Sequence, residues 1–245
     1  MKLSEEMKNK TLLSFELFPP KTEKGLQNLP GTIDHLMKYN PSYISCTYGA
    51  GGGNVGANRE VCQMIKNAGT TPVTHFTVIK NTKEGIKEQL DQYLADGVDH
   101  MLALRGDIPL GETTTCGDFD YATDLVKFVR DTYGDKFEIA VAGSPEGHIS
   151  CRSLESDIAV LKQKQDNGAD YIMTQLCWDM EQFKYWLDAI RKAGITMPVD
   201  VGVMPILDQA ATINMALSRN GCVMDRELSR MISRHWLFPK PFAAK

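Results

Sequence analysis

The residue with the clearest chemical potential is Glu16, in the segment SFELFPP. It stands between Phe15 and Leu17, near the end of an apolar run that reads as a strand. An anionic carboxylate is costly to bury, so burial raises its pKa and lets the group hold a proton near neutral pH. Such a carboxyl is suited to general acid catalysis, and the alternative interpretation is a structural ion pair with a nearby Lys or Arg.

A second candidate is the tripeptide Arg105, Gly106 and Asp107, in the segment ALRGDIPLG. It directly follows another apolar run, so both charges would lie at a strand end, where Gly106 would let the backbone approach a flat ligand. The tripeptide is common, and only its position predicts ligand binding. Gln175 ends a later apolar run and offers amide donors and a carbonyl acceptor, which suit the edge of a heterocycle.

Three further features are weaker signals. The glycine-rich segment TYGAGGGNVGAN lacks the Lys-Ser/Thr of a P-loop and the dinucleotide spacing, so we expect a flexible loop with Thr47 as a hydrogen-bond donor beneath it. His75, in TPVTHFTVI, reads first as a satisfied core histidine, because no acidic or cysteine partner stands at metal-ligand spacing. Asp157, Lys162 and Lys164 fall on one predicted helix, where the ordinary interpretation is a solvated charged face.

These residues are embedded in a repeated alternation of short apolar runs and longer segments of helical period, which is typical of β-α units. We predict strands over 12–18, 42–48, 71–77, 98–104, 137–142, 170–175 and 199–204. We predict helices over 23–39, 56–68, 82–96, 120–133, 153–167, 179–193, 207–219 and 224–234.

Such a chain folds either as a closed (β/α) barrel or as a doubly wound open sheet. In a barrel, side chains at the C-terminal strand ends converge on one mouth, whereas an open sheet spreads them along an edge. The polar residues at the predicted strand ends therefore favour the TIM-type barrel. They are Glu16, Thr47, His75, Arg105, Asp107, Glu146 and Gln175.

Composition excludes several classes of function. The length of 245 residues predicts one globular domain over 1–245, with an irregular tail over 235–245. The formal net charge of -4 predicts no basic surface for binding nucleic acid. No apolar run approaches the roughly 20 residues that cross a bilayer, and the start has no signal peptide, so we expect a cytoplasmic protein with no membrane partner. The 6 cysteines form no C-x-x-C pair, so we expect no metal site.

Seven segments resemble, in order and spacing, the motifs of the methylenetetrahydrofolate reductase family. They are SFELFPPKT, SCTYGAGG, HFTV, LALRGD, SPEGH, DNGADYIMTQLCWD and GVMPI. The pair F-E-x-F-P-P and L-R-G-D is the specific part of this resemblance, which runs over about 12–234. The resemblance implies a (β/α)8 barrel with FAD bound at its C-terminal mouth.

The resemblance also implies residue roles. Glu16 corresponds to a general acid that protonates the folate nitrogen and opens the five-membered ring to an iminium ion. Asp107 corresponds to an aspartate that lies near the flavin and faces the folate, and Gln175 to a residue that contacts the folate and the nicotinamide donor. Positions that resemble flavin-binding ones are Thr47, Tyr48, His75, Leu104, Arg105, Gly106, Asp107, Tyr121, Ala122, Ser144, Glu146, His148, Asp157, Lys162 and Lys164. The implied reaction is a ping-pong reduction of 5,10-methylenetetrahydrofolate to 5-methyltetrahydrofolate by NADH or NADPH.

Three departures from the family pattern open alternatives. Ser144 replaces an aromatic residue, and Gln163 replaces an arginine, which makes FMN an alternative to FAD. The last β/α unit of the family is expected to be missing, so a homo-oligomer or a partner subunit would complete the barrel wall. The competing hypotheses are a non-catalytic or incomplete barrel subunit, and another folate- or pterin-dependent barrel enzyme or an aldolase.

Overall fold

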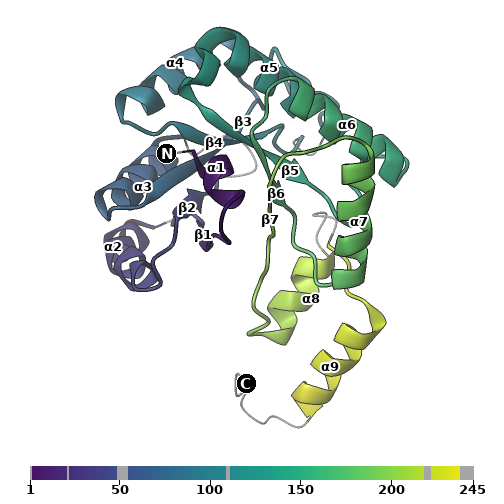
Figure 1. The fold of residues 1–245 in the computed structure, drawn as a ribbon. Coiled ribbons are helices and arrows are strands. Elements are labelled where there is room, and N and C mark those ends of the chain that lie inside the picture. Colours follow the sequence, from purple (N-terminus) through teal and green to yellow (C-terminus); the bar gives the residue numbers. More distant parts are fainter. Residues whose placement is uncertain (1, 21, 49–54, 109–110, 218–221, 238–245) are drawn as a thin grey trace. The chain divides into compact units, whose positions relative to one another are not determined.

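The computed structural model describes residues 2–20, 22–48, 55–108, 111–217 and 222–237, in which strands and helices alternate (Figure 1). The strands are β1 (Ser14–Leu17), β2 (Tyr43–Cys46), β3 (Thr71–Thr77), β4 (His100–Leu104), β5 (Glu138–Gly143), β6 (Tyr171–Thr174) and β7 (Val199–Asp200). The helices are α1 (Leu3–Met7), α2 (Glu23–Met37), α3 (Val55–Asn67), α4 (Lys83–Ala95), α5 (Ala122–Tyr133), α6 (Leu154–Asp166), α7 (Met180–Lys192), α8 (Gln209–Leu217) and α9 (Arg226–Leu237), with a 3-10 turn η1 (Gly134–Lys136). Within the described ranges no helix is both long and apolar enough to span a membrane.

Every predicted strand and helix is present, with differences at the ends of the chain. β7 was expected over 199–204 but stops at Asp200, because the N–H of Gly202 donates to the Thr174 hydroxyl at 2.9 Å rather than to a strand carbonyl. α1 was not predicted. α9 extends to Leu237, so the first residues of the expected irregular tail are helical, and 238–245 lie outside the described residues.

The strands pair in chain order, β1-β2-β3-β4-β5-β6-β7. The pairs from β1 to β5 are all parallel, in registers such as Glu16 opposite Ser45 and His75 opposite Leu102. A doubly wound sheet reverses its strand order at a switch point, whereas a TIM-type barrel follows the chain. The sequential order therefore confirms the predicted barrel class, with seven strands described.

The chain divides into two compact units. The first comprises Met1–Ala142, Gln163–Ile172 and Met197–Val199, and therefore holds β1 to β4 with α1 to α5. The second comprises Gly143–Lys162, Met173–Thr196 and Asp200–Lys245, and holds α7, α8 and α9.

In the first unit, helices cover one face of the strands, as α4 illustrates. The Thr82 hydroxyl caps the first turn of this helix. Its buried residues Ile86, Leu90 and Tyr93 recur at helical spacing and form one apolar stripe. The Tyr93 ring packs on Phe76 of β3 with centroids 6.3 Å apart, which fixes the face of β3 that points toward the helices.

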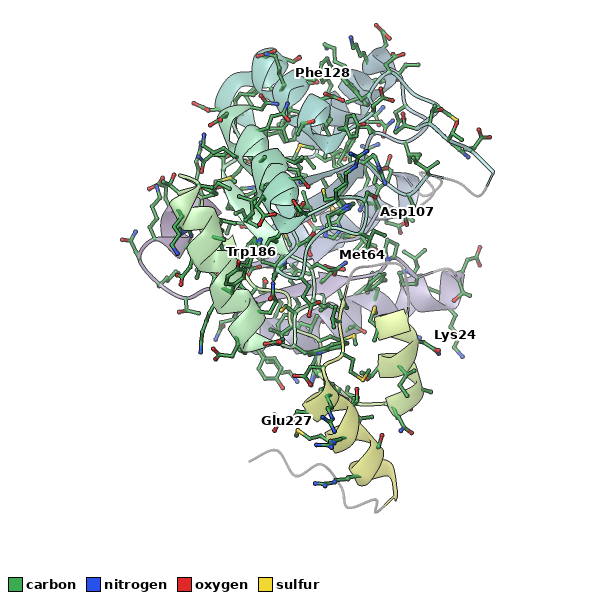
Figure 2. The ribbon with its side chains drawn as sticks, turned by 90° about the vertical axis from the view of Figure 1, so that its right-hand side faces the viewer. Lys24, Met64, Asp107, Phe128, Trp186 and Glu227 are labelled. Atoms are coloured by element: carbon green, nitrogen blue, oxygen red, sulfur yellow. The ribbon has the colours of Figure 1, made fainter. Side chains whose placement is uncertain are left out.

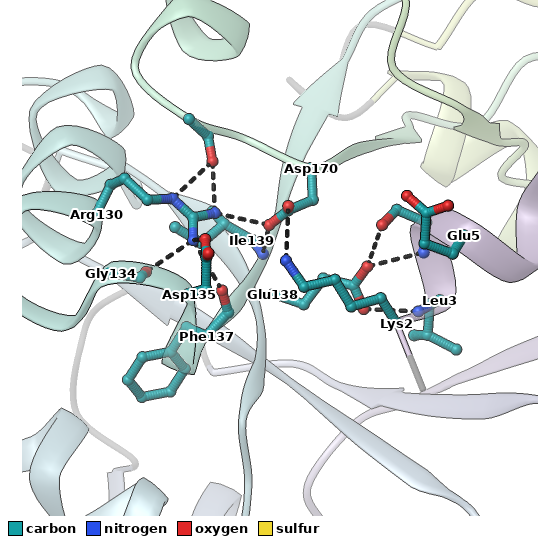
Figure 3. Close-up of polar contacts among 12 residues, drawn as sticks. Lys2, Leu3, Glu5, Arg130, Gly134, Asp135, Phe137, Glu138, Ile139 and Asp170 are labelled. Carbon is teal, nitrogen blue, oxygen red and sulfur yellow. Dashed lines mark hydrogen bonds and ion pairs between the residues drawn. The ribbon is translucent and has the colours of Figure 1, made fainter.

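The short helix α1 is held at the beginnings of β4 and β5 by one buried carboxylate. Glu138 accepts hydrogen bonds from the backbone N–H groups of Leu3 at 2.7 Å and Ser4 at 2.8 Å, and from the Ser4 hydroxyl (Figure 3). His100 places Nε2 3.0 Å from Glu138 and Nδ1 2.7 Å from Asp99. This network lies at the opposite end of the strands from the predicted chemistry.

Arg130 of α5 closes a second polar cluster at the same end (Figure 3). Its guanidinium donates to the Asp170 carboxylate at 2.8 Å, to the Gly168 carbonyl at 2.6 Å and to the Gly134 carbonyl at 2.7 Å. The same Asp170 oxygen, Oδ2, also accepts the N–H of Ile139 at 2.8 Å. One planar fork thus ties a helix to the beginnings of β5 and β6.

Candidate active site

The alternation of side chains along β3 defines the candidate site. Phe76 points toward α4, as its contact with Tyr93 establishes. Successive side chains of a strand point to opposite faces, so His75 and Thr77 lie on the face away from that helix. Both are buried, with exposed fractions of 7% and 3%. This inner face of β3 carries polar groups where a core strand would carry apolar ones.

The parallel register extends the inner face to β2 and β1. Ser45 pairs with Val73, which precedes His75 on the same face, and Glu16 pairs with Ser45. Because paired residues of neighbouring strands point the same way, Glu16, Ser45 and His75 share one face. The structure brings two predicted site residues together here, since Oε2 of Glu16 lies 3.9 Å from Nε2 of His75.

Burial shifts the pKa of both residues toward their neutral forms. Dense surroundings raise the pKa of Glu16, although its side chain keeps 47% of its surface open to solvent. Burial lowers the pKa of His75 to about 4, so its imidazole is neutral near pH 7. A neutral imidazole gives no charge to hold a carboxylate ionised, and among the described residues no Lys or Arg pairs with Glu16. The arrangement therefore favours a proton-holding carboxyl over a structural ion pair.

Three buried polar atoms on this face have no hydrogen-bond partner among the described residues: Ser45 Oγ, His75 Nε2 and Thr77 Oγ1. Each such atom costs roughly 1–3 kcal/mol unless a ligand or water satisfies it. The interpretation of His75 as a satisfied core histidine was therefore wrong. Sequence reasoning also missed Ser45 and Thr77, of which Thr77 carried a signal in its period-two spacing from His75.

The turn after β4 places its glycine in a conformation that other residues rarely adopt. Leu104 ends the strand, and Gly106 follows with φ of +87°, in the left-handed region. A Cβ at Gly106 would lie 3.0 Å from a methyl carbon of Ile79, so both space and dihedral require glycine. Arg105 donates from Nε to the Gly106 carbonyl at 3.2 Å, and Asp107 is exposed beyond the turn (Figure 2).

Thr47 and Tyr48 follow β2, and they contact the rest of the structure through different groups, Thr47 through its backbone and Tyr48 through its side chain. The N–H of Thr47 donates to the Leu17 carbonyl at 2.9 Å, which continues the pairing with β1. Tyr48 is buried, and its hydroxyl donates to Gln89 of α4 at 2.7 Å. Its side chain is thus engaged with the helix layer. Most of the predicted glycine-rich loop, 49–54, lies outside the described residues.

Three other predicted cofactor residues of the first unit lie at helix and strand ends. Tyr121 precedes α5 with 61% of its surface exposed, and its N–H donates to Asp124 at 2.9 Å, while Ala122 is the first helical residue. Lys164 of α6 donates to the Ala142 carbonyl at 3.0 Å, at the end of β5. Its amino group therefore points at a strand end, so the solvated-face interpretation was wrong for Lys164.

The remaining predicted residues belong to the second unit, where Glu146 and Asp157 serve as acceptors for backbone groups. Glu146 accepts the N–H of Val223 at 2.6 Å, and burial raises its pKa. Asp157 accepts the N–H of His148 at 3.1 Å, so these two predicted residues are neighbours. Gln175 accepts the N–H of Leu176 at 2.9 Å through its own side-chain oxygen. Ser144 and Lys162 are half-buried.

A pocket of about 320 Å³ lies within this second unit and contains two of the predicted cofactor residues, Glu146 and His148. Its full lining is Glu146, Gly147, His148, Ile149, Cys151, Ser153, Leu154 and Gln182. Gln182 of α7 fixes one wall by donating to the Pro145 carbonyl at 2.7 Å. No cluster of His, Cys, Asp or Glu suited to a metal ion occurs in the part of the chain that the structure describes.

A parallel sheet in strand order, with a carboxyl of raised pKa and buried polar atoms without protein partners on its inner face, defines a barrel of the enzyme-bearing class. The family model described as methylenetetrahydrofolate reductase matches residues 2–228. The chain therefore belongs to the methylenetetrahydrofolate reductase family.

Similar proteins agree with this assignment. Methylenetetrahydrofolate reductase (NADH) 1 of Arabidopsis thaliana is 38% identical over 219 residues, which cover 84% of this chain and 37% of that protein. The 5,10-methylenetetrahydrofolate reductase of Escherichia coli K12 is 34% identical over 202 residues, covering 82% and 67%. A Clostridium thermocellum protein that binds two copies of 5-methyl-5,6,7,8-tetrahydrofolic acid shares the fold, with a TM-score of 0.66 at 14% identity over 95% of this chain and 79% of that one. The chain spans 37% of the length of the plant relatives that it matches.

Proposed function

We propose that this chain is the catalytic barrel of a methylenetetrahydrofolate reductase, which reduces 5,10-methylenetetrahydrofolate to 5-methyltetrahydrofolate with a bound flavin and NAD(P)H. The observation that carries the proposal is the pair of Glu16 and His75, 3.9 Å apart on an inner face whose buried polar atoms lack protein partners. Family membership supplies the substrate class, since the matched relatives are named for this reaction.

The residues on the inner face fit a flavin, whose polar edge would satisfy Ser45, His75 and Thr77. Gly106 keeps the turn after β4 free of a side chain, so a flat ring could approach the backbone there. When bound, the flavin supplies the redox chemistry by accepting a hydride from the nicotinamide and passing it to the folate. FAD is the expected form, and FMN is the alternative because Gln163 replaces the family arginine.

The protein's own chemical step is assigned to Glu16. Burial raises the pKa of this carboxyl and so favours its protonated form, and its open side-chain surface gives a substrate access to the group. Protonation of the folate nitrogen breaks the ring bond to the methylene carbon, which then accepts the hydride. Asp107 is proposed to face the folate beside the flavin, and Gln175 to contact the folate and the nicotinamide in turn.

Glu16→Gln tests this assignment through the two half-reactions. Reduction of bound flavin by NADH is expected to survive, whereas transfer from reduced flavin to methylenetetrahydrofolate falls by roughly 100-fold or more, as loss of a general acid implies. Stopped-flow absorbance of the flavin measures each half-reaction separately, with NADPH as a second donor. Glu60→Gln, at an exposed position of α3, is the matched control. Equal losses in both half-reactions would remove the proposed role.

An alternative is a barrel subunit that needs a partner. In the described sheet β1 and β7 are the end strands, and unpaired strand edges recruit additional chain. Purified protein that takes up FAD or FMN but does not oxidise NADH would favour this alternative. Protein that stays colourless with either flavin would count decisively against the proposed flavoenzyme.

A further inference from the structure

A fully buried carboxamide stands directly behind the end of β2. Asn58 of α3 has no exposed surface, and its Nδ2 donates to the Cys46 carbonyl at 3.0 Å and to the Thr47 carbonyl at 3.1 Å. Both amide hydrogens are therefore used on two successive backbone carbonyls. The Thr47 carbonyl also lies 3.7 Å from the Cys46 thiol, a much weaker donor.

The side-chain oxygen of Asn58 is also fully hydrogen-bonded. Asn58 Oδ1 accepts the Tyr93 hydroxyl at 2.7 Å, the Thr74 hydroxyl at 2.8 Å and the Cys62 thiol at 3.5 Å. The reverse orientation of the amide would set a donor against three donors and an acceptor against two carbonyls, so only one orientation is allowed. Hydrogen bonds from β3, α3 and α4 therefore fix the orientation of the Asn58 side chain.

The position of the Asn58 side chain matters because it lies where the hydrogen-bonded pairing of β2 with β3 ends. The β2–β3 register ends at Cys46 opposite Thr74, so carbonyls beyond that point lose their sheet partners. Asn58 replaces those partners, and the N–H of Thr47 is fixed from the other side by the Leu17 carbonyl at 2.9 Å. The backbone of Thr47 is therefore clamped between β1 and α3.

A second carboxamide does the same at the end of β3. Asn81 donates to the Thr77 carbonyl at 3.2 Å, and its own oxygen accepts from Gln89 at 3.0 Å. Gln89 in turn accepts the Tyr48 hydroxyl at 2.7 Å. Side-chain amides thus replace missing ladder bonds behind both strands that carry the orphaned inner-face groups.

We infer that Asn58 is a positioning residue for the flavin site: its amide clamps the carbonyls of Cys46 and Thr47 and so fixes the backbone from which the Thr47 contact is made. The inference rests on the proposed function. Asn58 touches no ligand itself, because it lies on the helix side of β2. Its effect is transmitted through Thr47, at the start of the glycine-rich segment.

The test compares Asn58→Asp with Tyr93→Phe. The first keeps the shape of the side chain but removes both donors to the carbonyls. The second removes one donor to Oδ1, and Thr74 and Cys62 still hold the amide in place. Each variant is titrated with FAD and with FMN by flavin fluorescence, its unfolding midpoint in urea is measured, and exchange of the Thr47 amide hydrogen is followed. Asn58→Ala is the second variant if Asn58→Asp does not fold.

We expect the Kd for flavin to rise at least about 10-fold in Asn58→Asp, as for other supporting-shell losses, and to stay within about 2-fold in Tyr93→Phe. The Thr47 amide should exchange faster in the first variant only. Equal Kd changes in two variants of similar urea midpoint would overturn the inference and leave the proposed function standing. Wild-type protein that binds neither FAD nor FMN would overturn the proposed function, and the role of Asn58 in it.

Discussion

Replacing His100 by glutamine should flatten the pH dependence of unfolding on the alkaline side. His100 is 9% exposed and lies between two carboxylates, with Glu138 at 3.0 Å and Asp99 at 2.7 Å. Burial alone would lower its pKa, but the interactions of its two ring nitrogens with the Asp99 and Glu138 carboxylates outweigh burial and raise the pKa to about 9. The imidazole is therefore protonated in the folded chain at neutral pH, and mostly neutral in the unfolded chain.

The direction of the effect follows from that difference. A group whose pKa is raised by folding stabilises the protein fully below its unfolded pKa, near 6.5, and loses this contribution as the pH rises through about 9. Glu138 has the opposite behaviour. Burial would raise its pKa, but hydrogen bonds from His100, Ser4 and Leu3 lower it to about 2, so its contribution is present above pH 4.5 and fades toward pH 2.

The magnitude comes from the distance between 6.5 and about 9. At about 1.4 kcal/mol per pH unit, protonation of His100 stabilises the folded state by roughly 3 kcal/mol at low pH. The lowered pKa of Glu138 describes the same ion pair, so the two figures are not added. Stability of the wild type should therefore fall by up to roughly 3 kcal/mol more than that of His100→Gln between pH 6.5 and pH 9.

Urea unfolding followed by circular dichroism at half-unit steps from pH 5 to pH 9.5 measures this difference. His35→Gln is the control, because His35 is an exposed histidine of α2. Parallel curves for wild type and His100→Gln across the alkaline range would refute the reasoning. They would mean that the buried imidazole titrates alike in the folded and unfolded chains.

Two further predictions concern backbone conformation and a planar ion pair. Gly106→Ala should lower stability by roughly 1–2 kcal/mol and weaken FAD binding, because φ is +87° and the new Cβ would lie 3.0 Å from Ile79. Thermal unfolding and a flavin titration check this. An unchanged Kd for FAD would show that this turn is not part of the flavin site. Arg130→Lys should lower the free energy of unfolding in urea by roughly 2 kcal/mol, since one ammonium cannot bind Asp170 and three carbonyls at once. A loss below about 0.5 kcal/mol would show that the guanidinium geometry is dispensable.

The elements of the fold were predictable because apolar residues follow one spacing in the helices and another in the strands of a β-α repeat. Helical spacing of residues such as Ile86, Leu90 and Tyr93 and the apolar runs of the strands are local signals. The barrel order was predictable from polar residues at strand ends. α1 was missed, because a five-residue helix has almost no periodicity and is held by Glu138, far along the chain.

The candidate site was predictable only in part, because its remaining members depend on register. Glu16 stood out as a charge in an apolar strand, whereas Ser45 is one of many serines until β1 and β2 are aligned. The neutrality of His75 follows from its burial, which cannot be recognised from a lone histidine in a strand sequence. Asn58 carries no sequence signal at all, since its importance lies in five partners, four in two strands and two helices and one, Thr47, just after β2.

The anchoring of α1 has a consequence for how the chain is made. Leu3 is synthesised 135 positions before its acceptor, Glu138. At roughly 5–20 residues per second, the helix waits on the order of ten seconds before its dock exists. Throughout that interval α1 lacks the carboxylate that holds it, so its residues remain accessible to chaperones and proteases until β5 has been made.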